Sequence, residues 1–487
     1  MENKSIWQYD IDDLKYKKLD KDIRCDILII GGGIAGLSSA YFFRDSKYKT
    51  VLVERRRCGC GISSMSTGKL TCVQNLIYNN LKNNYDDSKA LLYFNSQKDA
   101  IDIVKNIIES NNIDCDYMDT SSYVFTNDKK KIKNLEKEIA FYRKNNIKCD
   151  ITDIPTKYPS IYSFKVECGG VFNPVKYLMK LRDIIGEKID IYENTDIIKL
   201  KKNNDFYKAY TDSVNIISSK YVIVCTHYPF FIVPLFLPFK SSVEKSYLVC
   251  GECKENDNMQ LISDEVSFRY YKLKNKNYFI YGRCSHKVSD FLDDRDSYNE
   301  ILDEFKKYFN GNLKCYWLNH DIMSYDGLPY IGEVDDNLYI ACGFNKWGNT
   351  NGTIAGKVIY DIIMKNNNPY IGLFNPHRSI SFDKVKNLFI YNFSVMKRYI
   401  LNKIVPLINY YDDNVSVKLI DGKLCGIYID ENKNKHIVSN ICPHMKCNLI
   451  FNYIDKTWDC PCHGSRFDVD GNLIFGPSVY DIKIDKK

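Results

Sequence analysis

The sequence predicts an α/β fold that is followed by a small all-β domain. The apolar run 25–30 leads into a glycine-rich turn at 31–36, and residues 37–54 then follow the patterns of a helix and a second strand. Such alternation of strands and helices is typical of an α/β domain. Near the end of the chain, the short runs 416–420 and 423–429 lie on either side of an Asp-Gly turn, as in an antiparallel β domain.

The length of the chain and its breaks indicate separate domains. With 487 residues, of which 45% are hydrophobic, the chain can form about three domains. Pro369 and Pro376 follow asparagines and mark breaks in the pattern. We therefore interpret residues 371–404 as a connecting segment, in which the apolar positions of 383–404 have the spacing of a helix.

The glycine-rich turn has the spacing of a dinucleotide-binding site. Its three motif glycines follow the pattern G-x-G-x-x-G, which gives a tight turn, lets a pyrophosphate approach the backbone and packs the following helix closely. Eighteen residues after the last glycine, Glu54 ends the second strand, where an acid can bind a ribose hydroxyl. The pattern accepts FAD or a nicotinamide dinucleotide, since both present an ADP half. The residues predicted to contact the dinucleotide are Gly31, Gly33, Ile34, Ala35, Gly36, Glu54 and Arg55.

Four further blocks resemble the D-amino-acid-oxidase-like FAD family, which includes glycine and sarcosine oxidases. They lie at 169–174, 222–227, 326–332 and 343–352. The resemblance implies that the dinucleotide is FAD and that the last block opens a helix whose N-terminus faces the flavin ring. Backbone N–H groups there would stabilise negative charge on the reduced flavin. The flavin contacts implied in this block are Gly343, Phe344, Trp347, Gly348 and Thr350.

A loop rich in glycine and hydroxyl groups, 59–68, follows the ribose-binding strand. In the resembling family, a loop at this position contacts the pyrophosphate and the flavin ring. A flexible connection is the alternative interpretation. We favour the contact, and expect it at Ser63, Ser64 and Thr67.

The resemblance covers about residues 22–370 and implies a FAD-binding Rossmann-like domain that is interleaved with an α+β substrate domain. We place the FAD-binding parts at about 22–75, 150–235 and 320–370, and the substrate domain at about 76–149 and 236–319.

Two short loops near the carboxyl end contain the ligands of an iron–sulfur centre. Cys442 and His444 form a Cys-x-His pair, and after fifteen further residues Cys460 and His463 form a Cys-x-x-His pair. Two thiolates and two imidazoles are the ligand set of a Rieske [2Fe-2S] centre, with the cysteines on one iron and the histidines on the other. Because neutral imidazoles replace two thiolates, the reduction potential rises above that of an all-cysteine cluster. A zinc site is the alternative.

Together with Cys447, Cys462 and Ser465, this region resembles the Rieske domains of cytochrome bc-type complexes over about residues 405–487. The resemblance implies a disulfide between Cys447 and Cys462, two residues that a zinc site leaves unexplained, and a hydrogen bond from Ser465 to a cluster sulfur. Many relatives carry Tyr where this chain has Phe467, so one donor is missing. We therefore expect a potential in the lower part of the range from about −150 to about +300 mV.

The FAD resemblance also implies a small-molecule substrate, an amine or an amino acid that loses a hydride from the carbon next to nitrogen. The cofactor supplies that chemistry, and the protein must orient the amine and neutralise any carboxylate. Arg269 is the first predicted partner of such a carboxylate and Lys346 the second. His286 is a further candidate for the pocket. The alternatives are a surface charge for Arg269 and a structural role for His286.

Two redox cofactors in one chain predict a dehydrogenase that passes electrons from FAD through the cluster to an external acceptor, a protein or a quinone-like molecule. The alternative is an electron-transfer protein that relays electrons between carriers without an organic substrate of its own, although the sequence shows no nicotinamide site for a donor. A plain oxidase would leave the cluster idle. A Rieske oxygenase needs a mononuclear iron held by two histidines and a carboxylate, and the remaining histidines, at 227, 286, 320, 377 and 436, include no pair at helical spacing.

The composition excludes several other classes. The 68 basic and 61 acidic residues leave a net charge of only +7, so nucleic-acid binding is not expected. No stretch is apolar enough for a transmembrane segment and the start of the chain lacks a signal peptide, so we expect a cytoplasmic protein. Outside the two cluster loops, most of the 18 cysteines are isolated, including Cys72, as buried thiols in a reducing compartment would be.

Overall fold

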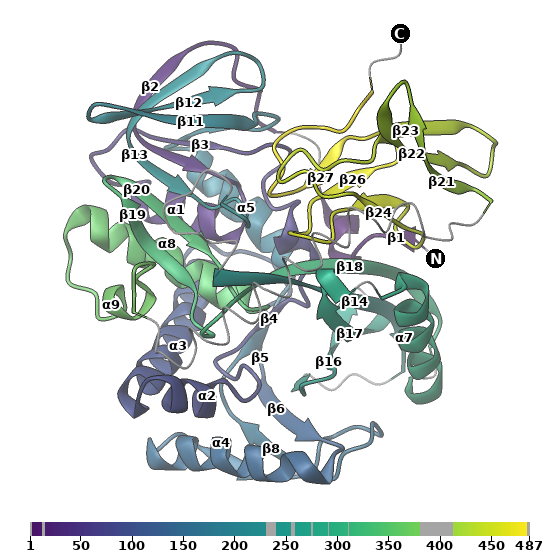
Figure 1. The fold of residues 1–487 in the computed structure, drawn as a ribbon. Helices are drawn as coiled ribbons and strands as arrows, with labels where there is room; N and C mark the ends of the chain where they lie inside the picture. Colours follow the sequence, from purple (N-terminus) through teal and green to yellow (C-terminus); the bar gives the residue numbers. More distant parts are fainter. Residues whose placement is uncertain are drawn as a thin grey trace.

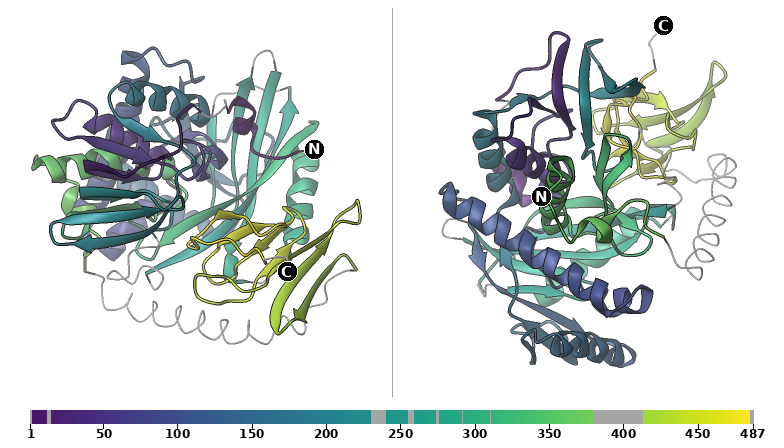
Figure 2. Two further views of the ribbon diagram at one scale, coloured as in Figure 1. Left: turned by 90° about the horizontal axis from the view of Figure 1, so that it is seen from above. Right: turned by 90° about the vertical axis from the view of Figure 1, so that its left-hand side faces the viewer.

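The computed structural model describes residues 2–11, 15–229, 240–254, 259–273, 276–290, 292–309, 311–379 and 413–484. Figure 1 shows two large sheets with their helices and a group of short strands formed by the C-terminal residues, in yellow. In both views of Figure 2 these yellow strands lie against the larger part of the molecule.

Eight strands of the described chain form a sheet around the glycine turn. They are β2 (Ile23–Ile30), β3 (Thr50–Val53), β10 (Asp190–Tyr192), β11 (Ile197–Asn203), β12 (Phe206–Thr211), β13 (Ile216–Val224), β19 (Tyr330–Asp335) and β20 (Leu338–Cys342). β2 pairs in parallel with β3 and with β13, and β13 pairs in parallel with β20. The carboxyl ends of these four strands therefore share one edge of the sheet.

The helices pack mainly around this sheet and at the lower end of the molecule in Figure 1. They are α1 (Ile34–Phe43), α2 (Ile77–Asn84), α3 (Asp87–Ser110), α4 (Ile132–Lys144), α5 (Pro174–Gly186), α7 (Asp294–Tyr308), α8 (Gly348–Met364) and α9 (Ile371–Phe374), with the short 3₁₀ helices η1 (Ile6–Asp10), η2 (Ile62–Met65), η3 (Lys129–Lys131) and η4 (Val288–Asp290).

Alternate residues of β2 enter two different cores. Ile27 and Ile29 belong to a core that includes residues of α1, α3, α5 and α8, whereas Leu28 and Ile30 belong to a smaller core on the opposite face of the sheet. Burial on both faces explains why this strand is a continuous apolar run rather than an alternating one.

A second sheet of nine described strands lies beside the first. It runs in the order β1 (Glu2–Asn3), β18 (Leu313–Ser324), β14 (Ser241–Cys253), β17 (Lys276–Lys287), β16 (Ser267–Leu273), β15 (Met259–Ile262), β6 (Ser121–Thr126), β8 (Tyr162–Val166) and β7 (Cys149–Ile151). Most neighbours are antiparallel, and β14, β17 and β18 form its long central part. A small third sheet contains β4 (Lys69–Leu70), β9 (Gly170–Val171) and β5 (Met118–Asp119).

The C-terminal residues form two small antiparallel sheets. The first contains β21 (Val415–Ile420), β22 (Lys423–Ile429) and β23 (Lys435–Ser439), and the second contains β24 (Ile450–Asn452), β25 (Thr457–Asp459), β26 (Arg466–Asp468) and β27 (Leu473–Phe475). Trp458 is fully buried in their common core, where it packs against Phe451 with ring centroids 5.0 Å apart. The α/β fold with an all-β C-terminal region confirms the predicted fold class.

The strands interleave more finely than the sequence boundaries suggest. β8 belongs to the nine-stranded sheet, although residues 150–235 were expected in the FAD-binding part. β18 runs without interruption across the expected boundary at residue 320. The expected helix at 383–404 lies outside the described residues.

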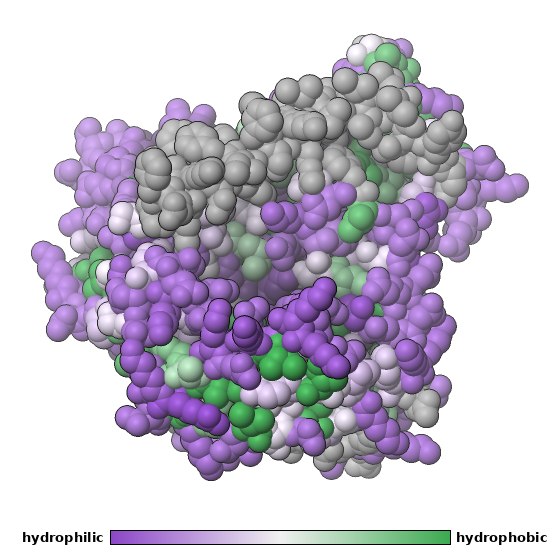
Figure 3. Space-filling model, turned by 60° about the horizontal axis from the view of Figure 1, so that its bottom comes forward, coloured by the Kyte–Doolittle hydropathy of each residue, from purple (hydrophilic) through white to green (hydrophobic). Residues whose placement is uncertain are grey.

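Two further features of the described chain concern its cysteines and its surface. Cys72, expected as a free thiol, forms a disulfide with Cys168. None of the described helices is long and apolar enough to cross a membrane. On the face in Figure 3, hydrophilic residues surround smaller hydrophobic areas.

Glycines in α8 let this helix approach α1 closely. A Cβ atom at Gly352 would lie 2.6 Å from Ile34 Cγ2, and one at Gly356 would lie 2.6 Å from the backbone N of Ser39. α1 follows β2 and α8 follows β20, so both helices begin at the edge where the parallel strands end. Their close contact therefore sets the spacing of the two helix N-termini.

We predict that Gly356→Ala lowers the free energy of unfolding by about 1 to 3 kcal/mol, because an added methyl group in this contact pushes the helices apart. Chemical unfolding followed by circular dichroism measures the change. Gly372→Ala is the matched control, since a Cβ atom there meets no atom within 4 Å. Equal effects of the two substitutions would contradict the proposed packing.

Candidate active site and metal centre

A cavity of about 450 Å³ lies at the edge of the eight-stranded sheet where the parallel strands end. The glycine turn after β2, the end of β3, the segment after β13 and the N-terminus of α8 form one side of it. Residues of β14, β17 and β18 in the nine-stranded sheet form the other side. Ligands of open α/β sheets bind at this edge, outside the carboxyl ends of the strands. We call this space the FAD cavity.

Most residues predicted to contact the dinucleotide line the FAD cavity. The Glu54 carboxylate accepts hydrogen bonds from the backbone N–H groups of Gly32, at 2.7 Å, and Arg56, at 2.9 Å. It is thereby held next to the glycine turn. The predicted residues that line the cavity are Gly31, Gly33, Ile34, Ala35, Glu54, Arg55, Ser63, Thr67, Phe344, Trp347, Gly348 and Thr350.

Three predicted contacts lie behind the cavity wall instead. A Cβ atom at Gly36 would stand 1.8 Å from the carbonyl oxygen of Gly31, so this glycine serves the packing of α1 on the turn. The Ser64 hydroxyl donates to the carbonyl of Gly61 at 2.8 Å. Gly343, with φ +71°, turns the chain after β20. These residues shape the wall without lining it.

The residues present fit FAD. Gly33 is the N-cap of α1 and α8 begins at Gly348, and both residues line the cavity. Helix N-termini present unpaired N–H groups and partial positive charge, which suit a pyrophosphate at one end and an electron-rich flavin at the other. A Cβ atom at Gly31 would lie 2.7 Å from the carbonyl oxygen of Cys225, so this glycine lets the turn pack against the chain after β13.

The three predicted substrate residues meet different surroundings. Lys346 lines the cavity, where its Nζ pairs with Glu244 Oε2 at 2.9 Å and contacts the Ser285 hydroxyl. Arg269 is fully buried outside the cavity lining, with its guanidinium donating to the carbonyls of Thr67 and Phe172, both at 3.2 Å. On β16 it lies two residues after Ser267, which lines the cavity, and the loop 67–68 covers it.

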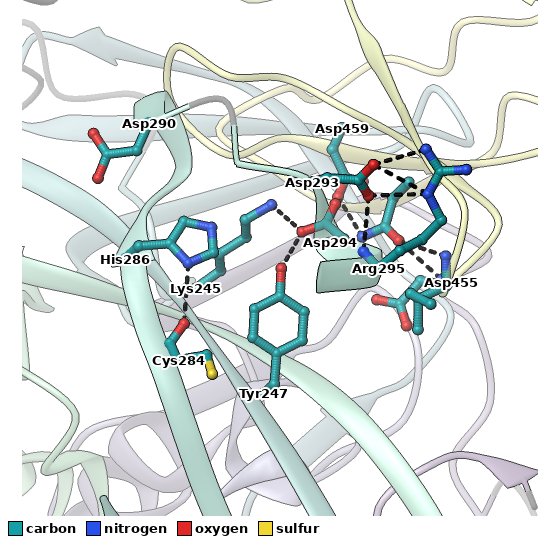
Figure 4. Close-up of polar contacts among 12 residues, drawn as sticks. Lys245, Tyr247, Cys284, His286, Asp290, Asp293, Asp294, Arg295, Asp455 and Asp459 are labelled. Atoms are coloured by element: carbon teal, nitrogen blue, oxygen red, sulfur yellow. Dashed lines mark hydrogen bonds and ion pairs between the residues drawn. The ribbon is translucent and has the colours of Figure 1, made fainter. Parts of the chain in front are cut away.

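His286 also lies outside the cavity lining. Its Nδ1 is 3.0 Å from the carbonyl of Cys284, and its ring stacks on Tyr247 at 5.8 Å between centroids (Figure 4). On β17 the neighbouring Ser285 lines the cavity, so the alternation of the strand turns His286 to the opposite face.

Asp321 of β18 is a cavity residue that the sequence did not reveal. It is partly exposed to the cavity, accepts a hydrogen bond from Asn319 Nδ2 at 3.0 Å, and forms no ion pair within the described part of the chain. Burial and the nearby negative charge of Glu244 raise the pKa of Asp321 to about 6, although the positive charge of Lys346 acts in the opposite direction. A charged residue within an apolar strand was the only signal for it.

Lys69 is a second cavity residue that the sequence did not reveal. Its Nζ donates to the carbonyl of Leu261 and to the hydroxyl of Ser267, both at 2.8 Å. Burial, and then the charge of Arg269, hold the pKa of Lys69 well below its usual value. The cavity thus contains a buried amine where the chain after the loop 59–68 meets β15 and β16 of the nine-stranded sheet.

The two cluster loops bring their four predicted ligands together. The rings of His444 and His463 meet edge to face at 5.1 Å, and the Nδ1 atom of each is buried without a hydrogen-bond partner among the described residues. The thiols of Cys442 and Cys460 contact each other, and this contact is the main reason why the pKa of Cys442 falls to about 7. Two unpartnered ring nitrogens opposite two sulfurs fit a Rieske [2Fe-2S] cluster.

Backbone and covalent bonds hold these loops in place. The Cys442 N–H donates to the Cys447 carbonyl at 2.8 Å, and the Cys460 N–H donates to the Ser465 carbonyl at 2.7 Å. Cys447 and Cys462 form a disulfide between the loops, with Cα atoms 6.6 Å apart. Cys460 also lies within 4.8 Å of both disulfide sulfurs, but sulfurs bonded to each other are not metal ligands.

Ser465 connects the cluster site to the FAD cavity. Its side chain is fully buried, hydrogen-bonds with the Cys442 sulfur, and accepts the backbone N–H of Ser478 at 3.0 Å. Ser478 itself lines the FAD cavity, as do Ile474 and Phe475. The domain that holds the cluster therefore supplies part of the cavity wall.

Polar contacts seat this domain on β1 and α7. Asn3 Nδ2 donates to Asp455 at 3.0 Å, and the Arg295 guanidinium lies 4.3 Å over the ring of Tyr453. Figure 4 shows the acidic side chains gathered here, with Lys245 directed at Asp294 and Arg295 at Asp293. Both of these ion pairs lie within the first part of the chain, and the two parts meet through hydrogen bonds and ring contacts such as those of Asn3 and Arg295.

Ser465→Ala removes a hydrogen bond that stabilises extra negative charge on the cluster sulfurs, so we predict a lower reduction potential. A hydrogen bond to a charged group contributes about 1.5 kcal/mol, which corresponds to about 60 mV for one electron. Voltammetry of the whole protein measures the shift. Ser416→Ala on β21 is the matched control, and an unchanged potential in Ser465→Ala would refute the role.

Comparisons with known proteins agree with both sites. Residues 26–362 match the family model described as FAD dependent oxidoreductase, and residues 408–484 match the Rieske [2Fe-2S] domain. A putative Rieske 2Fe-2S iron-sulfur protein, YhfW of Bacillus subtilis, is 29% identical over 98% of this chain and 97% of its own length. The gamma-glutamylputrescine oxidoreductase of Escherichia coli is 22% identical over 72% of this chain and 86% of its own.

The structural comparison gives the same fold for the first part of the chain. Glycine oxidase from Geobacillus kaustophilus superposes with a TM-score of 0.62 at 14% sequence identity, covering 74% of this chain and all of its own. Because the family model covers more than half of the residues, the chain belongs to the FAD dependent oxidoreductase family and carries a C-terminal Rieske [2Fe-2S] domain.

Proposed function

We propose that the protein oxidises an amine in the FAD cavity and passes the electrons through the Rieske cluster to an external acceptor, a carrier protein or a quinone-like molecule. The observation that supports this most directly is the shared wall: Phe475 and Ser478 of the Rieske domain line the same cavity as Gly31 and Gly33 of the dinucleotide motif. An enzyme that gave its electrons only to oxygen would not need the cluster domain at this position.

The cofactors divide the chemistry between them. FAD supplies a hydride acceptor, and the cluster accepts one electron at a time. The protein must then bind the amine, orient its carbon–hydrogen bond and take the proton that leaves with the hydride. Asp321 is suited to the first and last of these tasks, since its carboxylate opens onto the cavity and Asn319 fixes its orientation.

The charges on the substrate side of the cavity favour an amine over a free α-amino acid. Two basic residues that line this side are already paired with acids, Lys346 with Glu244 at 2.9 Å and Arg283 with Glu300 at 3.0 Å. The third, Lys69, donates to the Leu261 carbonyl and the Ser267 hydroxyl, and burial holds its pKa well below the usual value. A substrate carboxylate would have to compete with these acids, whereas a substrate ammonium group can pair with Asp321. The similarity to an amine-acting relative such as gamma-glutamylputrescine oxidoreductase agrees with this preference.

Anaerobic mixing with candidate donors tests the proposal. We expect butylamine or diaminobutane to bleach the flavin absorbance and then to produce the electron paramagnetic resonance signal of the reduced cluster, with sarcosine and alanine slower. Bleaching by amines without any cluster signal would contradict the proposed order. A flavin that responds only to a reduced carrier protein would favour a relay between carriers instead.

We predict that Asp321→Asn lowers kcat/KM for the active amine by at least about tenfold, because a charge-assisted hydrogen bond of about 1.5 to 3 kcal/mol is lost. In the wild type, the rate of flavin reduction should rise as the pH rises through about 6, where Asp321 loses its proton. This rise should disappear in Asp321→Asn. Stopped-flow flavin bleaching on both sides of that pH measures both effects.

Asp335→Asn is the matched control, because Asp335 is exposed on the β19–β20 hairpin and pairs with Lys202 at 3.3 Å. It should keep the wild-type rate and pH dependence. If Asp321→Asn behaves like this control, Asp321 does not bind the amine.

A further inference from the structure

One aromatic side chain of the Rieske domain lines the FAD cavity and contacts two histidines of the oxidoreductase domain. Phe475 lines the cavity, and its ring meets the ring of His320 edge to face at 5.0 Å. The ring of His227 is also perpendicular to it, with centroids 6.4 Å apart. The sequence had set these histidines aside because they are far apart along the chain. The fold brings them to one aromatic ring.

His320 is buried in a way that its own packing does not explain. Only 1% of its surface is exposed, and its Nε2 atom is buried without a hydrogen-bond partner in the described part of the chain. Its Nδ1 lies 3.3 Å from the carbonyl of Gly464. Burying an imidazole with one unpaired nitrogen costs free energy that an apolar side chain at this position would avoid. A functional reason for the histidine is therefore expected.

The partner of His320 is the residue next to a cluster ligand. Gly464 follows His463 in the chain, has φ +75°, and leaves no room for a side chain. A Cβ atom there would lie 2.9 Å from Val243 Cγ1 and 3.3 Å from His320 Nδ1. The cluster loop is thus pressed directly against β14 and β18, and only a glycine permits this approach.

The contacts form an unbroken series from the cavity to the cluster. His227 lines the cavity and its side chain hydrogen-bonds to the backbone of His320. Phe475 contacts the ring of His320, which in turn contacts Gly464, and Gly464 is covalently joined to His463. Electron transfer slows steeply as the gap between donor and acceptor widens, and it is fastest through covalent bonds and atoms in contact.

We propose that Phe475 and His320 form the bridge by which electrons leave the FAD cavity for the cluster of the same chain, with His320 as a positioning residue for the Gly464 loop. The proposal rests on the proposed function and specifies its route. Oxidation of an amine to an imine releases two electrons and two protons. The electrons cross the bridge one at a time, and either two molecules of a one-electron carrier protein or one quinone take them up. The protons go to solvent or to that quinone.

The test uses the complete holoenzyme and needs no knowledge of the substrate. Under anaerobic conditions, light and EDTA reduce the bound flavin, and the electron paramagnetic resonance signal of the cluster reports the arrival of electrons. The variants are His320→Gln and Phe475→Leu. His436→Gln is the matched control. His436 belongs to the Rieske domain, as Phe475 does, but it pairs with Asp470 at 2.8 Å near the surface.

We expect both variants to slow cluster reduction by at least about tenfold, the scale on which residues that support a metal site change its activity. Flavin content, the rate of flavin photoreduction and the potential of the cluster should stay at wild-type values, because neither side chain is a ligand. The control should behave as the wild type in every respect.

The outcomes separate the route from the function. Wild-type rates of cluster reduction in both variants would overturn the bridge while leaving the proposed function intact. A slower rate that comes with a lost flavin or a shifted cluster potential would overturn the positioning role, since it would show general damage. A wild-type protein whose reduced flavin never delivers electrons to the cluster would overturn the proposed function itself.

Discussion

The close approach of the Gly464 loop to β14 and β18 is the contact on which the arrangement of the two redox sites depends. A cluster can exchange electrons with a flavin only across a short gap, and the position of the whole Rieske domain is fixed where its ligand loop touches the oxidoreductase sheet. Gly464 permits the contact because it carries no side chain, and its carbonyl oxygen lies 3.3 Å from His320 Nδ1, from which it can accept a hydrogen bond. The same seating brings Phe475 into the cavity wall.

The docking of the Rieske domain links the two sites by hydrogen bonds as well as by proximity. Ser478 lines the FAD cavity, and its backbone N–H donates to the Ser465 hydroxyl that hydrogen-bonds with the Cys442 sulfur. Any ligand that shifts the cavity wall therefore acts on a hydrogen bond that tunes the cluster. Such coupling is reciprocal in free energy, so the redox state of the cluster also acts on binding in the cavity.

The sequence was most informative where function depends on residues close together in the chain. The glycine turn, Glu54 and the cluster loops have fixed short spacings, because backbone geometry and metal coordination demand them. Asp321 and Phe475 enter the site through sheet pairing and domain docking, which no local pattern records. Arg269 shows that the prediction of a strand near the cavity does not reveal which of its residues line the cavity.

Arg269 was predicted on a strand that does approach the cavity, and residue 267 of that strand lines it. The loop 67–68 covers the next position on the same face of the strand, so the guanidinium of Arg269 meets backbone carbonyls. His286 lies outside the cavity lining for a simpler reason, because successive side chains of β17 point to opposite faces of the sheet. A register shift of one residue would have placed it in the cavity.

Charged residues on each side of the docking surface are paired within their own domain. Arg466 is buried and pairs with Asp455 and with Asp459, the latter at 3.0 Å, within the Rieske domain. On the facing surface, within the oxidoreductase domain, Lys245 is held by Asp294. Buried charge networks contribute little net stability, because desolvation offsets their attraction, but wrong pairings are costly.

Since these charged groups are paired within their own domain, the position of the cluster loop is determined by close packing. The Gly464 loop can lie beside Val243 and His320 only because Gly464 has no side chain, and Phe475 of the same domain packs on the ring of His320. A displacement of the Rieske domain would break these contacts together, so the contact that closes the cavity wall also sets the position of the cluster loop.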